Sequence, residues 1–251
     1  MTLLSIEDLS VSIHGKPIIR NVSFKLGAGE ILALTGESGS GKSISALALM
    51  GLLPYGSKKG GIINFEGKDL NKITETNFCK LRGKKISMVF QFGALFDFLN
   101  VIENVSLPLK KLTNHSKVEI EKYAKESLLD VGLEGSEYMI PSELSGGMKK
   151  RVGIARAISA NPEYILYDEP TTGLDPIMTH SINNLIKKIH KEEKLTSIIV
   201  THEMKTVQNV SDRVLFLDEG IIKYDGSPSK MHTSKDKTVL EFLEVSGSLQ
   251  Y

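Results

Sequence analysis

The sequence has little of what marks a secreted or membrane-spanning protein. A single cysteine, Cys79, excludes an internal disulfide, and we expect it to be a small structural side chain in a reducing compartment. No apolar run approaches the ~18 to 20 residues of a membrane span. Glu7 and Asp8 interrupt the stretch where a signal peptide would have its apolar core. We therefore expect a cytosolic chain that reaches any membrane through a partner.

The chain also lacks an excess of charge of either sign. Lys and Arg number 31 and Asp and Glu 30, which leaves a net charge of +1. Proteins that bind the phosphate backbone of nucleic acids usually carry an excess of basic residues. The balanced charge therefore leads us to expect no nucleic-acid partner. With 41% hydrophobic and 24% charged residues, and no repeat or low-complexity segment, the 251 residues predict one large or two small globular domains.

Buried apolar runs that alternate with helical patterns predict an α/β fold with a mostly parallel core sheet. An antiparallel hairpin of residues 3–13 and 18–26 precedes this pattern at a sheet edge. The middle of the chain is expected to be a helical insertion, because residues 118–131 have helical period. The expected core strands are residues 31–34, 86–90, 164–167, 198–200 and 214–217, and the other expected helices are residues 43–53, 182–189 and a short terminal helix at 239–245.

A glycine-rich loop lies between the first buried strand and the first helix. It matches the pattern G-x-x-x-x-G-K-[ST], and its residues are Gly36, Glu37, Ser38, Gly39, Ser40, Gly41, Lys42 and Ser43. Glycines 36, 39 and 41 allow positive φ, so that successive N–H groups form an anion nest at a helix N-terminus. Lys42 adds a charge for the outer phosphates, and the Ser43 hydroxyl can bind Mg²⁺. The alternative, a polar surface turn, is disfavoured by the flanking strand and helix, so we predict a nucleotide site.

Two adjacent carboxylates follow the strand at residues 164–167. Asp168 is expected at the carboxyl edge of the sheet, where it can hold Mg²⁺ largely through its water shell. Glu169 lies one residue further and is the candidate general base for the hydrolytic water. Two solvated acids at a strand end are the alternative, which the nearby phosphate loop disfavours.

Four further motifs occur in a familiar order. Leu144-Ser-Gly-Gly-Met148 resembles the signature motif of ABC transporter ATPases, and Gly173-Leu-Asp-Pro176 resembles the D-loop of that family. Gln91 is similar to the Q-loop glutamine, and His202 to the H-loop switch histidine. The resemblance covers most of the chain. It implies an ATPase that uses ATP and Mg²⁺, with Gln91 and His202 assisting Glu169 and with Gln91, Ser43 and Asp168 around the metal.

The signature has a physical interpretation of its own. Ser145, Gly146 and Gly147 open a predicted helix, so their N–H groups form a second anion site, without a lysine or an acidic pair. The family resemblance implies that this site closes on ATP held by another copy, in a head-to-tail homodimer around two ATP molecules. Asp175 would then be a contact across the dimer, in addition to its alternative role as the N-cap of the helix at Pro176.

The resemblance also implies a domain organisation. The whole chain, 1–251, would be one ABC ATPase domain, with an ATP-binding core at 1–91 and 162–235, which carries the antiparallel β subdomain. The helical signature subdomain would be 92–161. Residues 236–251 would contact the neighbouring subunit, or close the core of their own chain as a short amphipathic helix.

One departure from the family concerns the nucleotide base. The aromatic residue that usually stacks on adenine is absent, and Ile13 or His14 stands in its place. We therefore expect weak recognition of the base, so that GTP is an alternative substrate to ATP. Met148 replaces the commonest glutamine at a tolerant position.

Residues after Gln91 resemble those of the Mla-type or Mce-associated lipid transport ATPases, including Phe90–Phe96 and Asn100–Val105. The resemblance implies phospholipid transport, integral permease subunits, an Mce-type lipid-binding partner and a location on the cytoplasmic face of the inner membrane. Residues 45–54 look instead like peptide-importer ATPases, so a peptide or small-solute importer is the alternative. Five apolar residues are expected to form a groove for a permease helix, beside those that fill the core: Phe92, Leu95, Phe96, Phe98 and Leu99.

Two other classes compete with a transporter ATPase. Soluble ABC ATPases of translation or DNA repair usually have two cassettes or a long coiled-coil insertion, which a single cassette of 251 residues lacks. A small kinase or GTPase switch would use the same phosphate loop, but it leaves residues 144–148 unexplained.

Overall fold

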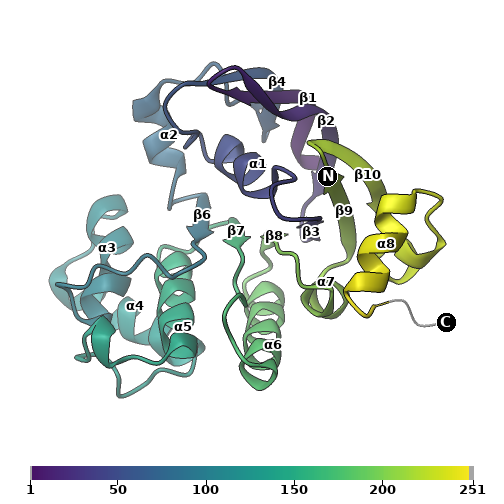
Figure 1. Cartoon of the computed structure of the whole chain (residues 1–251). Helices are drawn as coiled ribbons and strands as arrows, with labels where there is room; N and C mark the ends of the chain where they lie inside the picture. Colours follow the sequence, from purple (N-terminus) through teal and green to yellow (C-terminus); the bar gives the residue numbers. More distant parts are fainter. Residues whose placement is uncertain (1, 249–251) are drawn as a thin grey trace. The chain divides into compact units, whose positions relative to one another are not determined.

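The computed structural model describes residues 2–248, and these divide into two compact units (Figure 1). The first unit consists of two stretches of the chain, one that ends at Phe78 and one that begins at Thr196. The second unit runs from Cys79 to Leu195. Helix α2 (Glu75–Leu81) contains the point where the units divide.

The first unit begins with an antiparallel sheet in the order β2-β1-β4-β5. Strands β1 (Thr2–Ile13) and β2 (Lys16–Gly27) form the predicted hairpin, and alternate residues of β2 from Val22 to Leu26 are buried. Strands β4 (Ser57–Phe65) and β5 (Lys68–Asp69) complete the sheet. Sequence analysis did not predict β4, because its first half is polar and rich in glycine.

The second sheet of this unit has the order β10-β9-β3-β8. Strand β3 (Ile31–Thr35) pairs in parallel with β8 (Thr196–Val200) and with β9 (Arg213–Asp218). Strand β10 (Ile221–Gly226) pairs antiparallel with β9. Every residue of β3 and β8 is buried, as predicted for strands covered on both faces. Helix α7 (Met204–Val210) follows β8.

The first helix is shorter than predicted. Helix α1 covers Lys42–Leu49 and ends well before Pro54. Gly51 has a φ of 62°, and the Leu52 N–H donates to the Leu47 carbonyl at 2.8 Å. This left-handed glycine cap ends the helix, so the prediction that it continues to Leu53 and ends at proline was wrong.

The C-terminal helix α8 (Lys237–Val245) is capped by Asp236 and follows a short 3-10 helix at Pro228–Thr233. Val239 and Leu243 are buried in a core with Phe216 and Met231, and the Phe242 ring centroid lies 5.0 Å from that of Phe216. The apolar residues of this segment therefore close the core of their own unit. A contact with a second subunit stays a prediction, and residues 249–251 of that segment lie outside the described residues.

The second unit contains one parallel strand pair and the four longest helices of the described residues (Figure 1). Strand β6 (Ile86–Val89) pairs with β7 (Tyr164–Asp168), so that Val89 lies opposite Tyr167. Helices α3 (Val101–Leu112), α4 (Lys117–Asp130) and α5 (Gly146–Ile158) pack against one another. A 3-10 turn at Pro141–Glu143 precedes α5, and α6 (Pro176–Glu192) follows β7. The predicted helical segment 92–161 falls within this unit.

The starts of α3 and α4 are fixed locally. Asn100 with Glu103, and Ser116 with Glu119, each form a capping box in which the side chains satisfy the first backbone N–H groups. Sequence analysis missed α3, although this capping pattern was its signal. Cys79, expected to be a small structural side chain, is exposed on α2, and its thiol accepts a hydrogen bond from the Arg82 guanidinium.

Between residues 2 and 248, the chain has no helix with both the length and the apolar character that crossing a membrane requires.

Helix α8 provides a test of the core that it closes. We expect Leu243→Ala to lower the free energy of unfolding by about 2–5 kcal/mol, because it leaves a cavity between α8 and β9. Val245→Ala on the same helix is the matched control, since Val245 is 90% exposed, and its effect should stay within about 0.5 kcal/mol. Urea unfolding measures both. Equal effects of the two substitutions would show that α8 is not packed as described.

Candidate functional site

The glycine-rich loop between β3 and α1 has a backbone that only glycine adopts easily. Gly36, Gly39 and Gly41 have φ angles of 142°, 83° and 104°, which confirms the expectation of positive φ. A Cβ at position 36 would lie 2.0 Å from the Leu217 carbonyl oxygen, and one at position 41 would lie 2.4 Å from Ile19 Cδ1. The loop is therefore closely held from behind by the rest of its unit.

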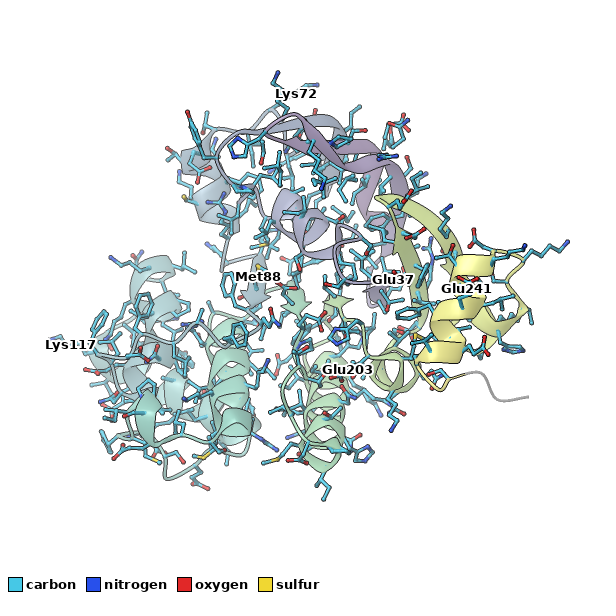
Figure 2. The ribbon with its side chains drawn as sticks, in the orientation of Figure 1. Glu37, Lys72, Met88, Lys117, Glu203 and Glu241 are labelled. Carbon is cyan, nitrogen blue, oxygen red and sulfur yellow. The ribbon has the colours of Figure 1, made fainter. Side chains whose placement is uncertain are left out.

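The lysine of the loop bends back over it. The buried Lys42 ammonium donates to the carbonyl of Gly36 at 2.9 Å and to that of Glu37 at 2.7 Å. Glu37, Ser38 and Ser43 are exposed, and Glu37 is labelled in Figure 2. The first turn of α1 contains no acidic residue. A positive helix end, a fixed ammonium and an accessible hydroxyl are thus presented together, which suits a polyphosphate.

The turn between β9 and β10 supports the loop. The Gly220 N–H donates to the Ser40 carbonyl at 3.1 Å, and the Arg20 N–H donates to the Gly220 carbonyl at 2.8 Å. Ser40 is buried, and its hydroxyl has no hydrogen-bond partner among the described residues. These bonds connect the loop to both sheets of the first unit.

His202 lies in the same unit as the phosphate loop. Leu34 of β3 lies opposite Val200 of β8 in a parallel pair, and the Thr201 N–H donates to the Leu34 carbonyl at 3.1 Å. The ends of these strands are therefore neighbours, one leading to Gly36 and the other to His202. His202 is exposed, immediately before Glu203, which Figure 2 labels.

The residues that stand at the adenine position differ in exposure. Ile13 is half-buried at the end of β1, and His14 is exposed with a φ of 48°. A Cβ at Gly56 would lie 2.5 Å from His14 Cε1, so the imidazole packs on that glycine. Stacking of either side chain on a base stays a prediction.

The second unit places Gln91 and the acidic pair at neighbouring strand ends. Asp168 is the last residue of β7, and Gln91 follows β6, its parallel neighbour. Glu169 is only 8% exposed and has a φ of 48°. The Thr172 hydroxyl donates to Glu169 Oε2 at 2.7 Å. A buried carboxylate on a left-handed backbone is held in one orientation, as a general base requires.

The signature residues start α5 as predicted. Ser145 is the N-cap, and its hydroxyl accepts a hydrogen bond from the Met148 N–H at 3.3 Å. Ser145 and Gly146 are exposed, and the first turn of α5 contains no acidic residue. The start of α5 can therefore receive an anion from outside the unit.

The loop at Gly173–Pro176 adjoins the signature. Asp175 caps α6 by accepting from the N–H groups of Ile177 and Met178, both at 2.9 Å, which confirms the predicted N-cap. A Cβ at Gly147 would lie 3.2 Å from Met178 Cε. Asp175 is itself exposed, so its predicted contact with another subunit has an accessible side chain.

A metal site made of protein ligands alone is not found in the described part of the chain, where no three His, Cys, Asp or Glu side chains are grouped to hold an ion. The predicted donors for Mg²⁺ are instead a hydroxyl, an amide and a carboxylate (Ser43, Gln91 and Asp168), and all three offer the oxygen atoms that this ion prefers. The rest of its shell would be phosphate oxygens and water.

Comparison with known proteins identifies the family. Residues 19–172 match the ABC transporter family. The arginine transport ATP-binding protein ArtM of Bacillus subtilis is 39% identical over 243 residues, which is 96% of this chain and 99% of ArtM. The chain belongs to the ABC transporter family. It carries the ATP-binding ATPase domain of that family, and the predicted fold class, enzyme class and cofactors are confirmed.

Other relatives of this cassette transport different cargoes. The methionine import protein MetN of Bartonella henselae is 42% identical over 226 residues, 90% of this chain, and the match spans only 64% of MetN. The intermembrane phospholipid transport protein MlaF of Haemophilus influenzae is 34% identical over 244 residues, 96% of this chain and 90% of MlaF. The family is therefore established and the Mla-type subfamily is not.

Solved cassettes share the fold. The dimeric ATP-binding cassette MJ0796 with ADP and Pi has a TM-score of 0.81 at 30% identity, covering 90% of this chain and 99% of that one. CbiO1 of Clostridium perfringens, part of the transporter complex cbiONQ, has a TM-score of 0.83 at 29% identity, covering 97% and 95% of the two chains.

The segment after Gln91 exposes three aromatic rings of the cassette. Phe92, Phe96 and Phe98 are 78%, 46% and 81% exposed, whereas Leu95 and Leu99 are half-buried and partly fill the core. The Phe96 and Phe98 rings meet edge to face at 5.6 Å. Buried Asn104 holds the loop, because its amide accepts from the Phe96 N–H at 2.9 Å and donates to the Leu99 carbonyl at 3.1 Å. We call Phe92, Phe96 and Phe98 the aromatic surface.

Sequence analysis missed three supporting residues of the cassette: Asn104, Lys150 and Thr172. For Lys150 a signal was present. It lies three residues after Gly147 and four before Ile154, which places a lysine on the buried face of α5.

Proposed function

We propose that this chain is the ATP-hydrolysing subunit of a membrane transporter and works as a pair of copies around two ATP molecules. The observation that carries the proposal is the phosphate loop. Its backbone requires glycine at positions 36 and 41, and the Lys42 ammonium is bonded to its carbonyls. In this role the loop N–H groups and Lys42 bind the β- and γ-phosphates. Ser43, Gln91 and Asp168 would hold Mg²⁺, which would neutralise charge on those phosphates.

Glu169 is the proposed general base. Its carboxylate would orient and deprotonate the attacking water, and the buried position and the Thr172 bond keep it in one direction. The amide of Gln91 would orient the same water from the neighbouring strand end. His202 would contact the γ-phosphate from the first unit, in which it adjoins the phosphate loop.

The second half of each nucleotide site would come from the other copy. The N-terminus of α5, at exposed Ser145 and Gly146 and buried Gly147, is a positive helix end with no acidic residue in its first turn. The γ-phosphate bound by Lys42 of one copy would also bind the N-terminus of α5 of the other copy, with Asp175 of that copy beside it. The dimeric state of the similar cassette MJ0796 supports the arrangement. ATP would then hold the dimer closed, and hydrolysis would release it.

The aromatic surface is the proposed docking site for a helix of the permease. Exposed aromatic rings on a loop fixed by Asn104 suit a helix that inserts into a groove. Docking there would place the chain on the cytoplasmic face of the inner membrane. The ATP-binding core would be 1–91 and 162–235, with 92–161 as the helical subdomain that meets the permease.

For the cargo, we propose phospholipid or a related lipid, with an Mce-type lipid-binding partner. The resemblance after Gln91 and the match to MlaF over 96% of the chain support this. The second candidate is a methionine or other small-solute importer, favoured by the higher identity to MetN and ArtM.

The general base is tested by Glu169→Gln. We expect ATP to bind with unchanged affinity, the dimer to stay closed, and turnover to fall by roughly 10² or more, because the base is lost. Lys42→Ala should instead weaken ATP binding itself. Phosphate release, nucleotide titration and size-exclusion chromatography measure the three effects. Hydrolysis at the parental rate in Glu169→Gln would refute the assignment.

The docking site is tested by Phe98→Asp. We expect the variant to lose association with the permease in copurification and to keep its ATP affinity, because a carboxylate replaces an exposed ring. Val118→Asp is the matched control, since Val118 is 79% exposed elsewhere on the same unit. A Phe98→Asp complex that purifies whole would contradict the proposed docking.

The cargo is tested on the native complex. We expect mass spectrometry of the purified assembly to detect bound phospholipid and an Mce-type chain. An assembly without lipid, whose ATPase rate rises with methionine or another solute and its binding protein, would favour the second candidate.

A further inference from the structure

The signature helix carries a buried lysine that the proposed mechanism does not use. Lys150 lies in the second turn of α5 and is 5% exposed. Its ammonium donates to the main-chain carbonyl of Gln91 and, at 3.0 Å, to that of Glu169. All three residues belong to the second unit. One cation therefore joins the signature helix to both loops that carry the proposed hydrolytic residues.

The strand pairing explains how one ammonium reaches both carbonyls. Val89 of β6 lies opposite Tyr167 of β7, and each is followed two residues later by one of the two carbonyls. Helix α5 packs against β6. Figure 2 shows β6 at Met88, next to the helical part of the unit. The lysine thus lies at the carboxyl ends of two parallel strands, where the loops with Gln91 and Glu169 begin.

Glu169 needs such support because its backbone is strained. A φ of 48° is uncommon for a residue with a side chain, and its cost must be met by surrounding contacts. The Lys150 ammonium and the Thr172 N–H, at 3.4 Å, both donate to the Glu169 carbonyl, while the Thr172 hydroxyl holds the carboxylate. The direction of this peptide group determines where the carboxylate points.

The loop after Gln91 is held along the same helix. The Arg156 guanidinium donates to the carbonyls of Gly93 at 2.6 Å and Ala94 at 2.7 Å. A Cβ at Gly153 would lie 3.3 Å from Gly93 Cα, so the loop lies directly on α5. Arg156 therefore holds the loop after Gln91 in addition to Lys150. The hydrogen bond from Lys150 to the Glu169 carbonyl, in contrast, connects α5 to the second loop.

We propose that Lys150 is a positioning residue for ATP hydrolysis, whose ammonium fixes the Gln91 and Glu169 main chains relative to each other and so aims the carboxylate at the water. The proposal rests on the function proposed above for Glu169. Hydrogen bonds from an ammonium are stronger than those from a neutral donor, and two carbonyls share this one. Loss of the cation would leave the part-buried Gln91 carbonyl and the buried Glu169 carbonyl without this donor, and would free the Glu169 peptide group to turn.

The test is Lys150→Met in the full chain, measured by turnover and by ATP titration. We expect kcat to fall roughly 10- to 100-fold, as for a misplaced catalytic group, while the ATP dissociation constant stays within about twofold. Lys150→Arg, which keeps a charged donor, should recover part of the turnover. Lys149→Met, the adjacent lysine on the same helix, is the matched control and should keep the parental rate. If Lys150→Met does not fold, Lys150→Gln takes its place and is read in the same way.

A double-mutant cycle separates positioning from a general loss of structure. In a Glu169→Gln background, Lys150→Met should lower the residual turnover by less than twofold, because the carboxylate that it positions is already absent. An equal loss in both backgrounds, an unchanged kcat, or a loss confined to ATP affinity would overturn the proposal. A Glu169→Gln variant with the parental rate would overturn the proposed function itself, whatever Lys150 does.

Discussion

The phosphate loop depends on one constraint: a backbone path that a side chain would block. At Gly36 the path passes so close to the Leu217 carbonyl oxygen that a Cβ would lie 2.0 Å from it, and a Cβ at Gly41 would lie 2.4 Å from Ile19 Cδ1. Two carbonyls of the same loop, those of Gly36 and Glu37, hold the Lys42 ammonium in place. The buried strand β3, the turn at Gly220 and helix α1 hold this path in place. Recognition of phosphate is thus built into the backbone, and the side chains add charge and chemistry to it.

The second unit has a candidate anion site of its own at the N-terminus of α5, with fewer charged groups than the phosphate loop. The N-terminus of α5 offers N–H groups and no acidic side chain, and its neighbours at Asp175 and Met178 fix its surroundings. It has the geometry for an anion but no lysine in the loop, and the acidic pair of this unit lies at the strand ends rather than at α5. The proposed dimer accounts for two helix ends of unequal chemistry on one chain: the charge-rich end would bind ATP, and the other end, from the second copy, would complete the site. In the proposed dimer, ATP binding would be linked to assembly, since a nucleotide that bridges two copies would stabilise only the closed pair.

Local features of this fold could be predicted from sequence, because residues a few positions apart determine them. The positive φ angles at Gly36, Gly39 and Gly41, the buried strand β3 and the Asp175 cap are examples. The end of α1 was missed because Gly51 ends it before Pro54 can act. The bonds of Lys150 were also missed, since they join residues 59 and 19 positions apart, and no spacing rule connects a lysine to a distant carbonyl. The packing of α8 on Phe216 was one of two alternatives, which only tertiary contacts could separate.

The most direct test of the shared site is a crystal structure of the chain with Mg²⁺ and a slowly hydrolysed ATP analogue. The account predicts two copies related head to tail, with the γ-phosphate bonded to Lys42 of one copy and to Ser145 and the Gly147 N–H of the other. A triphosphate fully enclosed by a single chain, with Ser145 facing bulk solvent, would contradict it.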